Sequence, residues 1–302
     1  MTPTAPALVG PPPPLDRECA AVLAGLPPFP PLTLESIPAM RAGAAEYTPR
    51  PTNEQLARGG AYLVEEFAVP GPVGAPDVAL LVCRPAAAAA AAAAPAPALY
   101  YTHGGGMIAG TNRDSIVEIL DLAEQVGAAV VSVEYRLAPE TPHPGPVEDC
   151  YAGVLWTAEN AGELGIDGDR IVLIGGSAGG GIAAALALMA RDRGGPALAG
   201  QLLMCPMLDD ARGGPDVPPY ASPARATDLS GLPPAFIDVG SADTFRSEDV
   251  DYAERIWQAG GVAELHVWPG GFHAFDGMVP TARISQAAVA ARKDWLGRLM
   301  SR

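Results

Sequence analysis

The stretch that decides the fold is Gly175-Gly176-Ser177-Ala178-Gly179. An apolar run over residues 170–175 precedes it and predicts a buried strand, while residues 178–193 follow it with a helical pattern. A serine on so tight a strand-to-helix turn has strained backbone angles, and small neighbours let the turn close while the hydroxyl points outward. The glycines also fit a phosphate-binding turn, but no lysine follows them as it does in a P-loop. We therefore interpret Ser177 as an exposed nucleophile at a helix N-terminus, where developing negative charge is favoured.

Further strands and helices are expected on both sides of this turn. Apolar runs predict strands over residues 62–69, 78–84, 98–102, 129–135, 200–205, 235–239 and 264–268. Helical patterns separate the later strands, over residues 113–126, 146–162, 247–260 and 281–300. This alternation predicts an α/β fold with a mostly parallel eight-stranded sheet that carries helices on both faces. The first strands follow one another without a helix, so we expect an antiparallel hairpin at one edge.

The N-terminal part of the chain differs from the rest. Residues 1–14 are rich in proline and are expected to be disordered or loosely docked. Two weakly amphipathic segments, residues 15–26 and 32–43, predict short helices outside the main core. We expect residues 1–45 to form a Pro-rich segment with a small helical cap, and residues 46–302 to form the domain that carries the site.

Composition excludes several classes of protein. Of the 302 residues, 49% are hydrophobic and 18% charged, which excludes disorder along the whole chain. The 34 acidic residues outnumber 19 basic ones, of which only Lys293 is a lysine, and this argues against nucleic acid and anionic membrane partners. No apolar stretch predicts membrane insertion. The four cysteines lack metal-ligand spacing, so we expect reduced thiols in a cytoplasmic protein and no metal site.

A glycine-rich stretch, His103-Gly104-Gly105-Gly106, follows the predicted strand at 98–102. Consecutive glycines let backbone N–H groups converge on a substrate oxygen because no side chain blocks the approach. Two such donors and the N–H of Ala178, directly after the nucleophile, would form a three-donor oxyanion hole. A flexible loop with a packed histidine is the alternative, and the presence of G-x-S-x-G later in the chain disfavours it.

A base and an acid are expected after Ser177, in the chain order Ser, Asp or Glu, His. His273 lies in Pro269-Gly270-Gly271-Phe272-His273, directly after the predicted strand at 264–268. Asp243 follows the strand at 235–239 in the same way. Both side chains would therefore lie at the carboxyl ends of adjacent parallel strands, where open α/β sheets build their sites.

Other acids and histidines fit structural roles better. Asp238 lies inside a strand, so its side chain is expected on the wrong face of the sheet. His266 is on a strand and His143 lies among prolines. Glu248 and Asp249 open the next helix, where acidic residues are favoured by the helix dipole.

Together these motifs resemble the hormone-sensitive lipase family of α/β-hydrolases, in its bacterial esterase branch. The resemblance rests on the motifs at 103–106 and 176–180, on Tyr135-Arg136-Leu137-Ala138-Pro139-Glu140, and on the segments around Asp243 and His273. It implies a catalytic triad of Ser177, Asp243 and His273. It also implies oxyanion donors at Gly105, Gly106 and Ala178, with His103 and Gly104 supporting the loop and residues 135–140 bracing it from behind.

The resemblance implies a serine carboxylesterase that acts through an acyl-enzyme, without metal or cofactor. An amidase, a deacetylase or an acyltransferase would use the same triad, and a non-catalytic small-ligand receptor is disfavoured by the retained His273. A small-molecule ester is the expected substrate. A homodimer is expected through the edge strand between Glu264 and Trp268, which no lysine protects.

Two features depart from the family. Gly176 stands where an acidic residue is common before the nucleophile, and the stretch 206–228, which usually carries extra cap helices, is short. The roof over the site must then come mainly from the N-terminal segment, through Leu15, Val22, Leu23, Leu26, Phe29 and Leu32. Such a small, partly open site buries few methylene groups, so short acyl chains are expected.

Overall fold

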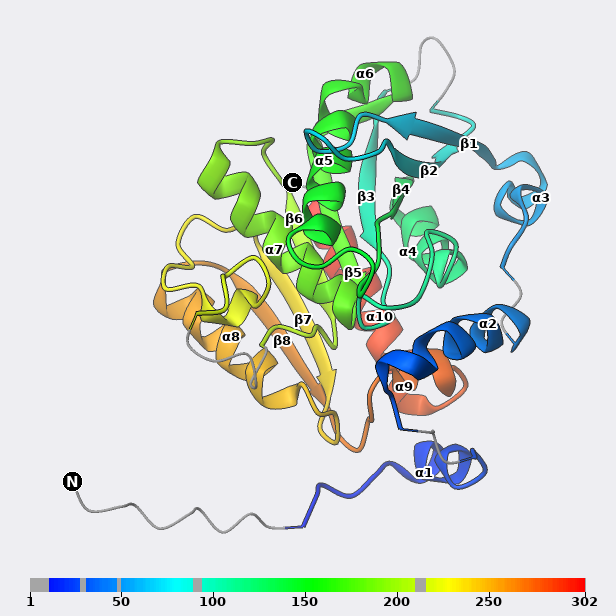
Figure 1. The fold of residues 1–302 in the computed structure, drawn as a ribbon, viewed down its shortest axis with the longest axis vertical. Helices are drawn as coiled ribbons and strands as arrows, with labels where there is room; N and C mark the ends of the chain where they lie inside the picture. The colour runs from blue at the N-terminus through cyan, green and yellow to red at the C-terminus, as the bar shows by residue number, and fades with distance from the viewer. Residues whose placement is uncertain (1–10, 28–30, 48–49, 89–93, 210–215, 302) are drawn as a thin grey trace.

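The computed structural model describes residues 11–27, 31–47, 50–88, 94–209 and 216–301. Within these residues, eight strands form one sheet in the order β1-β2-β4-β3-β5-β6-β7-β8 (Figure 1). The strands are β1 Tyr62–Val69, β2 Val78–Pro85, β3 Ala96–Thr102, β4 Ala129–Glu134, β5 Ile166–Gly176, β6 Gly200–Met204, β7 Ala235–Gly240 and β8 Ala263–Trp268. The eight predicted strands are thus confirmed, with ends that shift by a few residues.

The direction of pairing follows the connections. β1 pairs antiparallel with β2, and β2 pairs antiparallel with β4. All the other neighbours, from β4 and β3 through to β7 and β8, pair in parallel. The predicted hairpin at one edge is confirmed, and β8 forms the opposite edge.

Helices lie before, between and after the strands. The longer ones are α4 Ile116–Val126, α5 Gly145–Glu159, α7 Ala178–Arg193, α8 Arg246–Gln258 and α10 Arg283–Met300, and the short ones are α3 Asn53–Leu56, α6 Ala161–Leu164 and α9 Phe275–Met278. Helices α4 to α8 lie in the connections between strands, α3 precedes β1, and α9 and α10 follow β8. Single turns of 3₁₀-helix occur at Leu34–Ser36, Arg58–Gly60 and Pro223–Arg225. The helix predicted from residue 113 begins only at Ile116, because Ser115 has a left-handed φ of 55°. The segment predicted over 146–162 is divided at Asn160 into α5 and α6.

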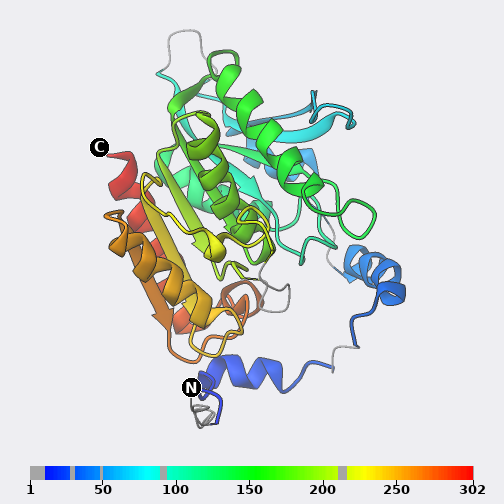
Figure 2. The same cartoon turned by 60° about the vertical axis from the view of Figure 1, so that its left-hand side comes forward.

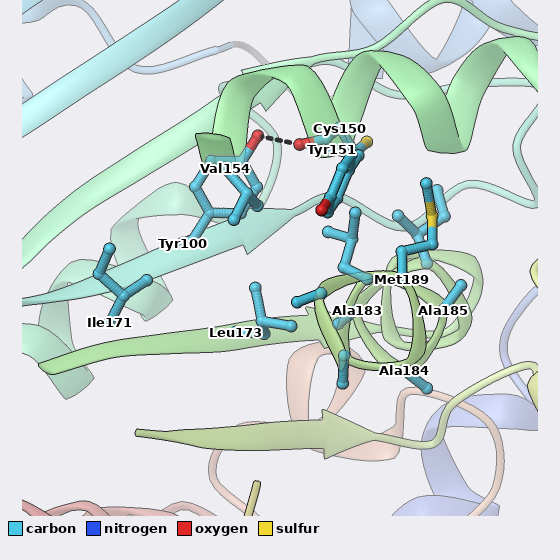
Figure 3. Packing of buried hydrophobic residues seen from close by; sticks show 14 of the residues in the cluster. Tyr100, Cys150, Tyr151, Val154, Ile171, Leu173, Ala183, Ala184, Ala185 and Met189 are labelled. Atoms are coloured by element: carbon cyan, nitrogen blue, oxygen red, sulfur yellow. Dashed lines mark hydrogen bonds between the residues drawn. The ribbon is translucent and has the colours of Figure 1, made fainter. Parts of the chain in front are cut away.

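Helices cover both faces of the sheet (Figure 2), and a buried apolar layer lies under the helices on each face. One contains buried residues of α5, α7 and α8, and the other contains buried residues of α4 and α10. In the first layer the alanine-rich α7 packs close to β5, and the Tyr100 hydroxyl donates to the Cys150 carbonyl at 2.8 Å (Figure 3). The central strands are therefore buried on both faces, as a parallel sheet requires.

The N-terminal helices α1 Arg17–Leu23 and α2 Ile37–Tyr47 lie beside the carboxyl ends of the parallel strands (Figure 1). α1 lies within the predicted segment 15–26, whereas α2 begins five residues after the start of the predicted segment 32–43, behind the 3₁₀ turn Leu34–Ser36. The expected roof is only partly present, because Leu15, Val22 and Leu32 are exposed, whereas Leu23 packs in a small cluster with Phe272. The predictions for residues 1–10, for Phe29 and for residues 210–215 lie outside the described part of the chain.

Candidate active site

Ser177 lies on the turn between β5 and α7, as predicted. Its φ of 56° and ψ of −125° are strained for a residue with a side chain. Backbone hydrogen bonds hold the turn, because the Ser177 N–H donates to the Met204 carbonyl at 2.9 Å and the Ser177 carbonyl accepts from Met207 N–H at 2.9 Å. The strain is thus maintained by the neighbouring β6 segment.

Two glycines of the motif are sterically required. A Cβ at Gly175 would lie 2.3 Å from the Gly179 carbonyl oxygen, and one at Gly179 would lie 2.0 Å from the Thr102 carbonyl oxygen. Gly176 differs, since the atoms nearest to its Cβ would belong to Met204 at 3.7 Å, an ordinary contact. A Cβ would therefore fit at position 176, so steric crowding at the Cβ does not explain why this chain has glycine where the family commonly has an acidic residue.

Ser177, His273 and Asp243 come together from three separate loops. The His273 Nε2 lies 2.9 Å from the Ser177 Oγ, and the His273 Nδ1 lies 2.9 Å from the Asp243 Oδ2. The Asp243 side chain is fully buried, while that of His273 is 37% exposed. The Asp243 Oδ1 also accepts from the Phe245 N–H at 2.9 Å. The carboxylate is therefore fixed in orientation and the histidine remains open to a substrate.

Close backbone contacts join the loops that carry Asp243 and His273. The Ala242 N–H donates to the Gly271 carbonyl at 2.9 Å, and the Gly270 N–H donates to the Ser241 Oγ at 2.8 Å. A Cβ at Gly240 would lie 2.0 Å from the Gly271 oxygen, so only glycine allows this approach. The distance between acid and base is thus set by the ends of β7 and β8.

The loop after β3 brings its glycines up to Ser177. A Cβ at Gly104 would lie 3.1 Å from the Gly176 oxygen and 3.6 Å from the Ser177 Cβ. Gly105 and Gly106 follow with φ of 109° and 65°, both exposed. Neither amide donates to another group of the described chain. The Ala178 N–H belongs to the first turn of α7, where amides lack helical acceptors.

His103 supports this loop from inside the protein. Its ring stacks on Tyr135 with 4.1 Å between centroids, and its Nδ1 lies 2.8 Å from the Gly104 oxygen. The Tyr135 hydroxyl donates to the His103 carbonyl at 2.8 Å. Burial lowers the pKa of His103 to about 4, so the ring is neutral above about pH 5 and its Nδ1–H can donate to Gly104. The support therefore does not titrate near neutral pH.

Comparison with known proteins agrees with this geometry. The sequence profile of the family described as alpha/beta hydrolase fold matches residues 99–217 and 211–277. The chain belongs to the α/β-hydrolase family. Carboxylesterase NlhH of Mycobacterium tuberculosis is 38% identical over 210 residues, which are 58% of this chain and 65% of NlhH. The resemblance to the hormone-sensitive lipase branch is confirmed.

Solved structures align with a larger share of this α/β-hydrolase than NlhH does. A bacterial heroin esterase superposes with a TM-score of 0.84 at 37% identity, covering 95% of this chain and 98% of that one. Esterase LipW of Mycobacterium marinum superposes with a TM-score of 0.82 at 31% identity, covering 95% of this chain and 96% of that one. Among the described residues, no helix is long and apolar enough to cross a membrane.

The residues that the sequence assigned to structural roles lie apart from the Ser177–His273–Asp243 contacts of the hydrolase. Asp238 is buried and accepts from Arg292 Nε and from Trp268 Nε1, both at 3.0 Å. His266 lies against Glu264, with its Nε2 3.0 Å from the Glu264 Oε1. The prediction that Asp238 faces away from the site is confirmed.

Glu248 and Asp249 lie in the first turn of α8, as predicted, and both have further surroundings that the sequence pattern does not indicate. The Glu248 carboxylate accepts from the amides of Leu208 and Asp209, at 2.7 and 3.0 Å, and so holds the segment after β6. Asp249 is fully buried, and neither of its oxygens has a hydrogen-bond partner among the described residues. Burial, with Glu248, Asp243 and Asp238 nearby, raises the pKa of Asp249 to about 10.

This buried acid predicts a pH-dependent stability. The unfolded carboxyl titrates near ~3.9, so between about pH 5 and 9 the folded state binds one proton more. The contribution of Asp249 to the free energy of unfolding is therefore fully present at low pH. It decreases as pH rises, by at most ~1.4 kcal/mol per pH unit. Asp249→Asn cannot ionise and should melt above wild type at about pH 8, but close to it at about pH 4. Melting temperatures across pH measure this, and parallel curves for the two proteins would contradict it.

Cys205 is a neighbour of the site that the sequence analysis did not single out. It directly follows β6 with a φ of 38°, and its sulfur, a carboxylate oxygen of Asp243 and a ring nitrogen of His273 lie within 4.8 Å of one another. Three such ligand atoms could hold a metal ion, yet Asp243 and His273 already hydrogen bond each other. The sequence feature that could have indicated Cys205 is its position directly after a strand of the parallel sheet.

Proposed function

We propose that this α/β-hydrolase is a serine carboxylesterase that hydrolyses short-chain acyl esters through an acyl-enzyme. The observation that carries the proposal is the continuous pair of 2.9 Å contacts from the Ser177 Oγ through His273 to Asp243. The names of its relatives, a carboxylesterase and a heroin esterase among them, support the same reaction class. A receptor without catalysis would not need this alignment.

The mechanism follows from the geometry. His273 Nε2 takes the proton of the Ser177 hydroxyl as Oγ attacks the ester carbonyl, and His273 then returns a proton to the leaving alcohol. Asp243 holds the Nδ1–H tautomer and stabilises the imidazolium that forms. The free amides of Gly105, Gly106 and Ala178 would stabilise the oxyanion, where one donor contributes about 3–4 kcal/mol. Water then repeats the sequence on the acyl-enzyme.

A fluorophosphonate probe with peptide mapping tests the proposal. Labelling at Ser177, together with turnover of p-nitrophenyl acetate, is the expected result. An unlabelled Ser177 in folded protein would refute it. The matching p-nitroanilide, and an alcohol added as acyl acceptor, separate an esterase from an amidase, a deacetylase or an acyltransferase that uses the same residues.

We further propose that residues 1–45 act as a cap on a catalytic domain of residues 46–302, and that the enzyme prefers short acyl chains. Exposed Leu15, Val22 and Leu32 do not build a deep apolar channel. Because each buried methylene contributes about 0.8 kcal/mol, a site that buries few of them gains little from a long chain.

A series of p-nitrophenyl esters measures this preference. We expect kcat/KM to be highest for acyl chains of roughly two to six carbons, beyond which added methylenes find no apolar surface to bury. Every ester of the series releases the same p-nitrophenol, so differences in kcat/KM report the acyl chain alone. A maximum at about twelve carbons or more would contradict the prediction.

We propose a homodimer that pairs through β8, in a cytoplasmic enzyme with no nucleic-acid partner. β8 is a sheet edge with Val267 40% exposed, and all four cysteines are free, which supports a reducing compartment. Light scattering at micromolar concentration should give a dimer mass, and Val267→Lys should give a monomer because a charge on the edge opposes pairing. A wild-type monomer would exclude the dimer.

A further inference from the structure

The loop that carries the proposed oxyanion donors needs support from outside itself. Gly105, Gly106, Met107 and Gly110 all have positive φ, and Met107 does so at 61° although it carries a side chain. Glycine-rich backbone loses more conformational freedom on ordering than other backbone does. The donors can act only if this loop is held in one conformation before the substrate arrives, since a preorganised dipole costs nothing to reorient during the reaction.

Arg41 of helix α2 provides one such support, from a distant part of the sequence. Its Nε donates to the Ile108 carbonyl at 2.6 Å, and one of its terminal nitrogens donates to the Ala138 carbonyl at 2.7 Å. Both terminal nitrogens also donate to the Glu140 carboxylate at 2.9 Å. The guanidinium therefore joins α2 to the oxyanion loop and to the segment behind that loop.

The backbone contacts of Arg41 matter more than its ion pair. Glu140 is 61% exposed, and an exposed ion pair contributes little stability. The two carbonyls are different, because Ala138 N–H itself donates to the Met107 carbonyl at 2.9 Å. Arg41 thus closes a ring of hydrogen bonds around residues 107, 108 and 138. A lysine has a single nitrogen and cannot reach the same acceptors with a planar fork.

The same N-terminal segment also contacts the histidine loop. The Asp16 N–H donates to the Gly270 carbonyl at 3.0 Å, and the Glu18 carboxylate accepts from the Arg283 N–H at 3.0 Å. Cys19 is buried in a cluster with Phe272 and Phe275, on either side of His273. α1 therefore holds the loop of the base, while α2 holds the loop of the oxyanion donors.

We propose that Arg41 is a positioning residue for the oxyanion hole, which makes the N-terminal segment part of the catalytic apparatus and not only a roof over the substrate. The inference rests on the proposed esterase function. Arg41 touches no reacting atom and acts through the Ile108 carbonyl on the amides of Gly105 and Gly106. Because these amides bind the oxyanion and not the ground-state ester, loosening them lowers kcat and leaves KM nearly unchanged.

The experiment compares full-length wild type, Arg41→Met and Arg41→Lys. We expect kcat for p-nitrophenyl acetate to fall about tenfold in Arg41→Met, a fraction of the 10²–10³ that loss of a whole donor costs. KM should change less than about twofold. The Ki of a trifluoromethyl ketone, whose tetrahedral adduct occupies the oxyanion hole, should rise by the same factor as kcat falls. Arg41→Lys keeps the charge but loses the planar guanidinium. It should therefore behave like Arg41→Met, because the hydrogen bonds and not the charge hold the loop.

Arg58→Met is the matched control. Like Arg41, Arg58 combines ion pairs with a hydrogen bond to a backbone carbonyl: it donates to the carboxylates of Asp121 and Glu124 and to the Val117 carbonyl. It joins the 3₁₀ turn at residues 58–60 to α4 and makes none of these bonds to the oxyanion loop. Its kcat and Ki should match wild type within about twofold, since surface ion pairs contribute little. Melting temperatures of all the variants separate a positional effect from a general loss of stability.

Hydrogen exchange keeps the inference testable without turnover. The peptide that contains residues 103–110 should exchange faster in Arg41→Met than in wild type or Arg58→Met, whether or not the protein hydrolyses the chosen ester. Inactive, unlabelled wild type would refute the proposed function, whereas active wild type with unchanged kcat, Ki and loop exchange in Arg41→Met would refute only the role of Arg41. Equal losses in Arg41→Met and Arg58→Met would likewise overturn that role.

Discussion

Ser177→Ala should abolish ester hydrolysis and leave the fold intact. The Ser177 Oγ lies 2.9 Å from the His273 Nε2, and the alanine side chain removes this hydroxyl while the small volume at the turn is kept. In serine hydrolases, loss of the nucleophile leaves only residual catalysis, so we expect kcat to fall by at least about 10⁴-fold. Turnover of p-nitrophenyl acetate and the melting temperature are the two measurements.

Thr102→Ser is a suitable control for this substitution. The Thr102 hydroxyl is buried near the same turn and donates to the Gly179 carbonyl at 2.7 Å, so serine keeps the hydroxyl without touching the proposed base. It should keep turnover within about an order of magnitude, as a buried methyl change costs little beyond stability. If Ser177→Ala retained more than a few per cent of wild-type kcat, another nucleophile would have to exist.

Asp243→Asn should lower kcat by about 10⁴-fold with little change in binding. The amide would still lie beside His273, but it can present an N–H toward Nδ1 and so favour the wrong tautomer of the imidazole. The buried Asp243 Oδ2 lies 2.9 Å from that nitrogen, so the orientation of the ring depends directly on this group. Steady-state kcat and KM for a short ester measure the effect.

Asp238→Asn distinguishes this role from the general effect of a buried acid. Asp238 is as buried as Asp243, but it pairs with Arg292 of helix α10. The loss of the Asp238 charge should lower the melting temperature, because the buried Arg292 guanidinium then keeps Asp276 as its ion-pair partner and loses Asp238. The kcat of the folded protein should stay near wild type. A 10⁴-fold loss in Asp238→Asn, with Asp243→Asn nearly silent, would reverse the assignment.

The sheet could be predicted from the sequence because buried parallel strands are uninterrupted apolar runs. The ends of the strands could not be predicted in the same way, because polar residues interrupt the apolar run there. β5 begins at Ile166, four residues before the predicted start, because Ile166 pairs with Ala96 although Asp167 and Asp169 follow it. Helix α9 has four residues, too few for a helical period to be recognised, and buried Phe275 in tertiary contact holds it.

The site was predictable where a motif or the end of a strand marks it. Ser177, Asp243 and His273 each lie in the loop that follows a strand, and the structure brings them together. Arg41 carries no such mark, because its acceptors at Ile108 and Ala138 lie 67 and 97 residues away in the chain. Asp249 shares its local pattern with Glu248 and differs only in burial, which depends on how α8 packs on the sheet.

The thiol of Cys205 affects how an inhibitor profile of this enzyme should be interpreted. Burial and the carboxylates of Asp243, Asp276 and Asp238 raise the pKa of this thiol, so it is a poor nucleophile at neutral pH. A mercurial that reached it would still place a large group beside His273, within the 4.8 Å cluster. Inactivation by such a reagent would then resemble that of a hydrolase with a catalytic cysteine. A Cys205→Ala variant that is active and resists the reagent would show that the thiol is a neighbour of the site and not the nucleophile.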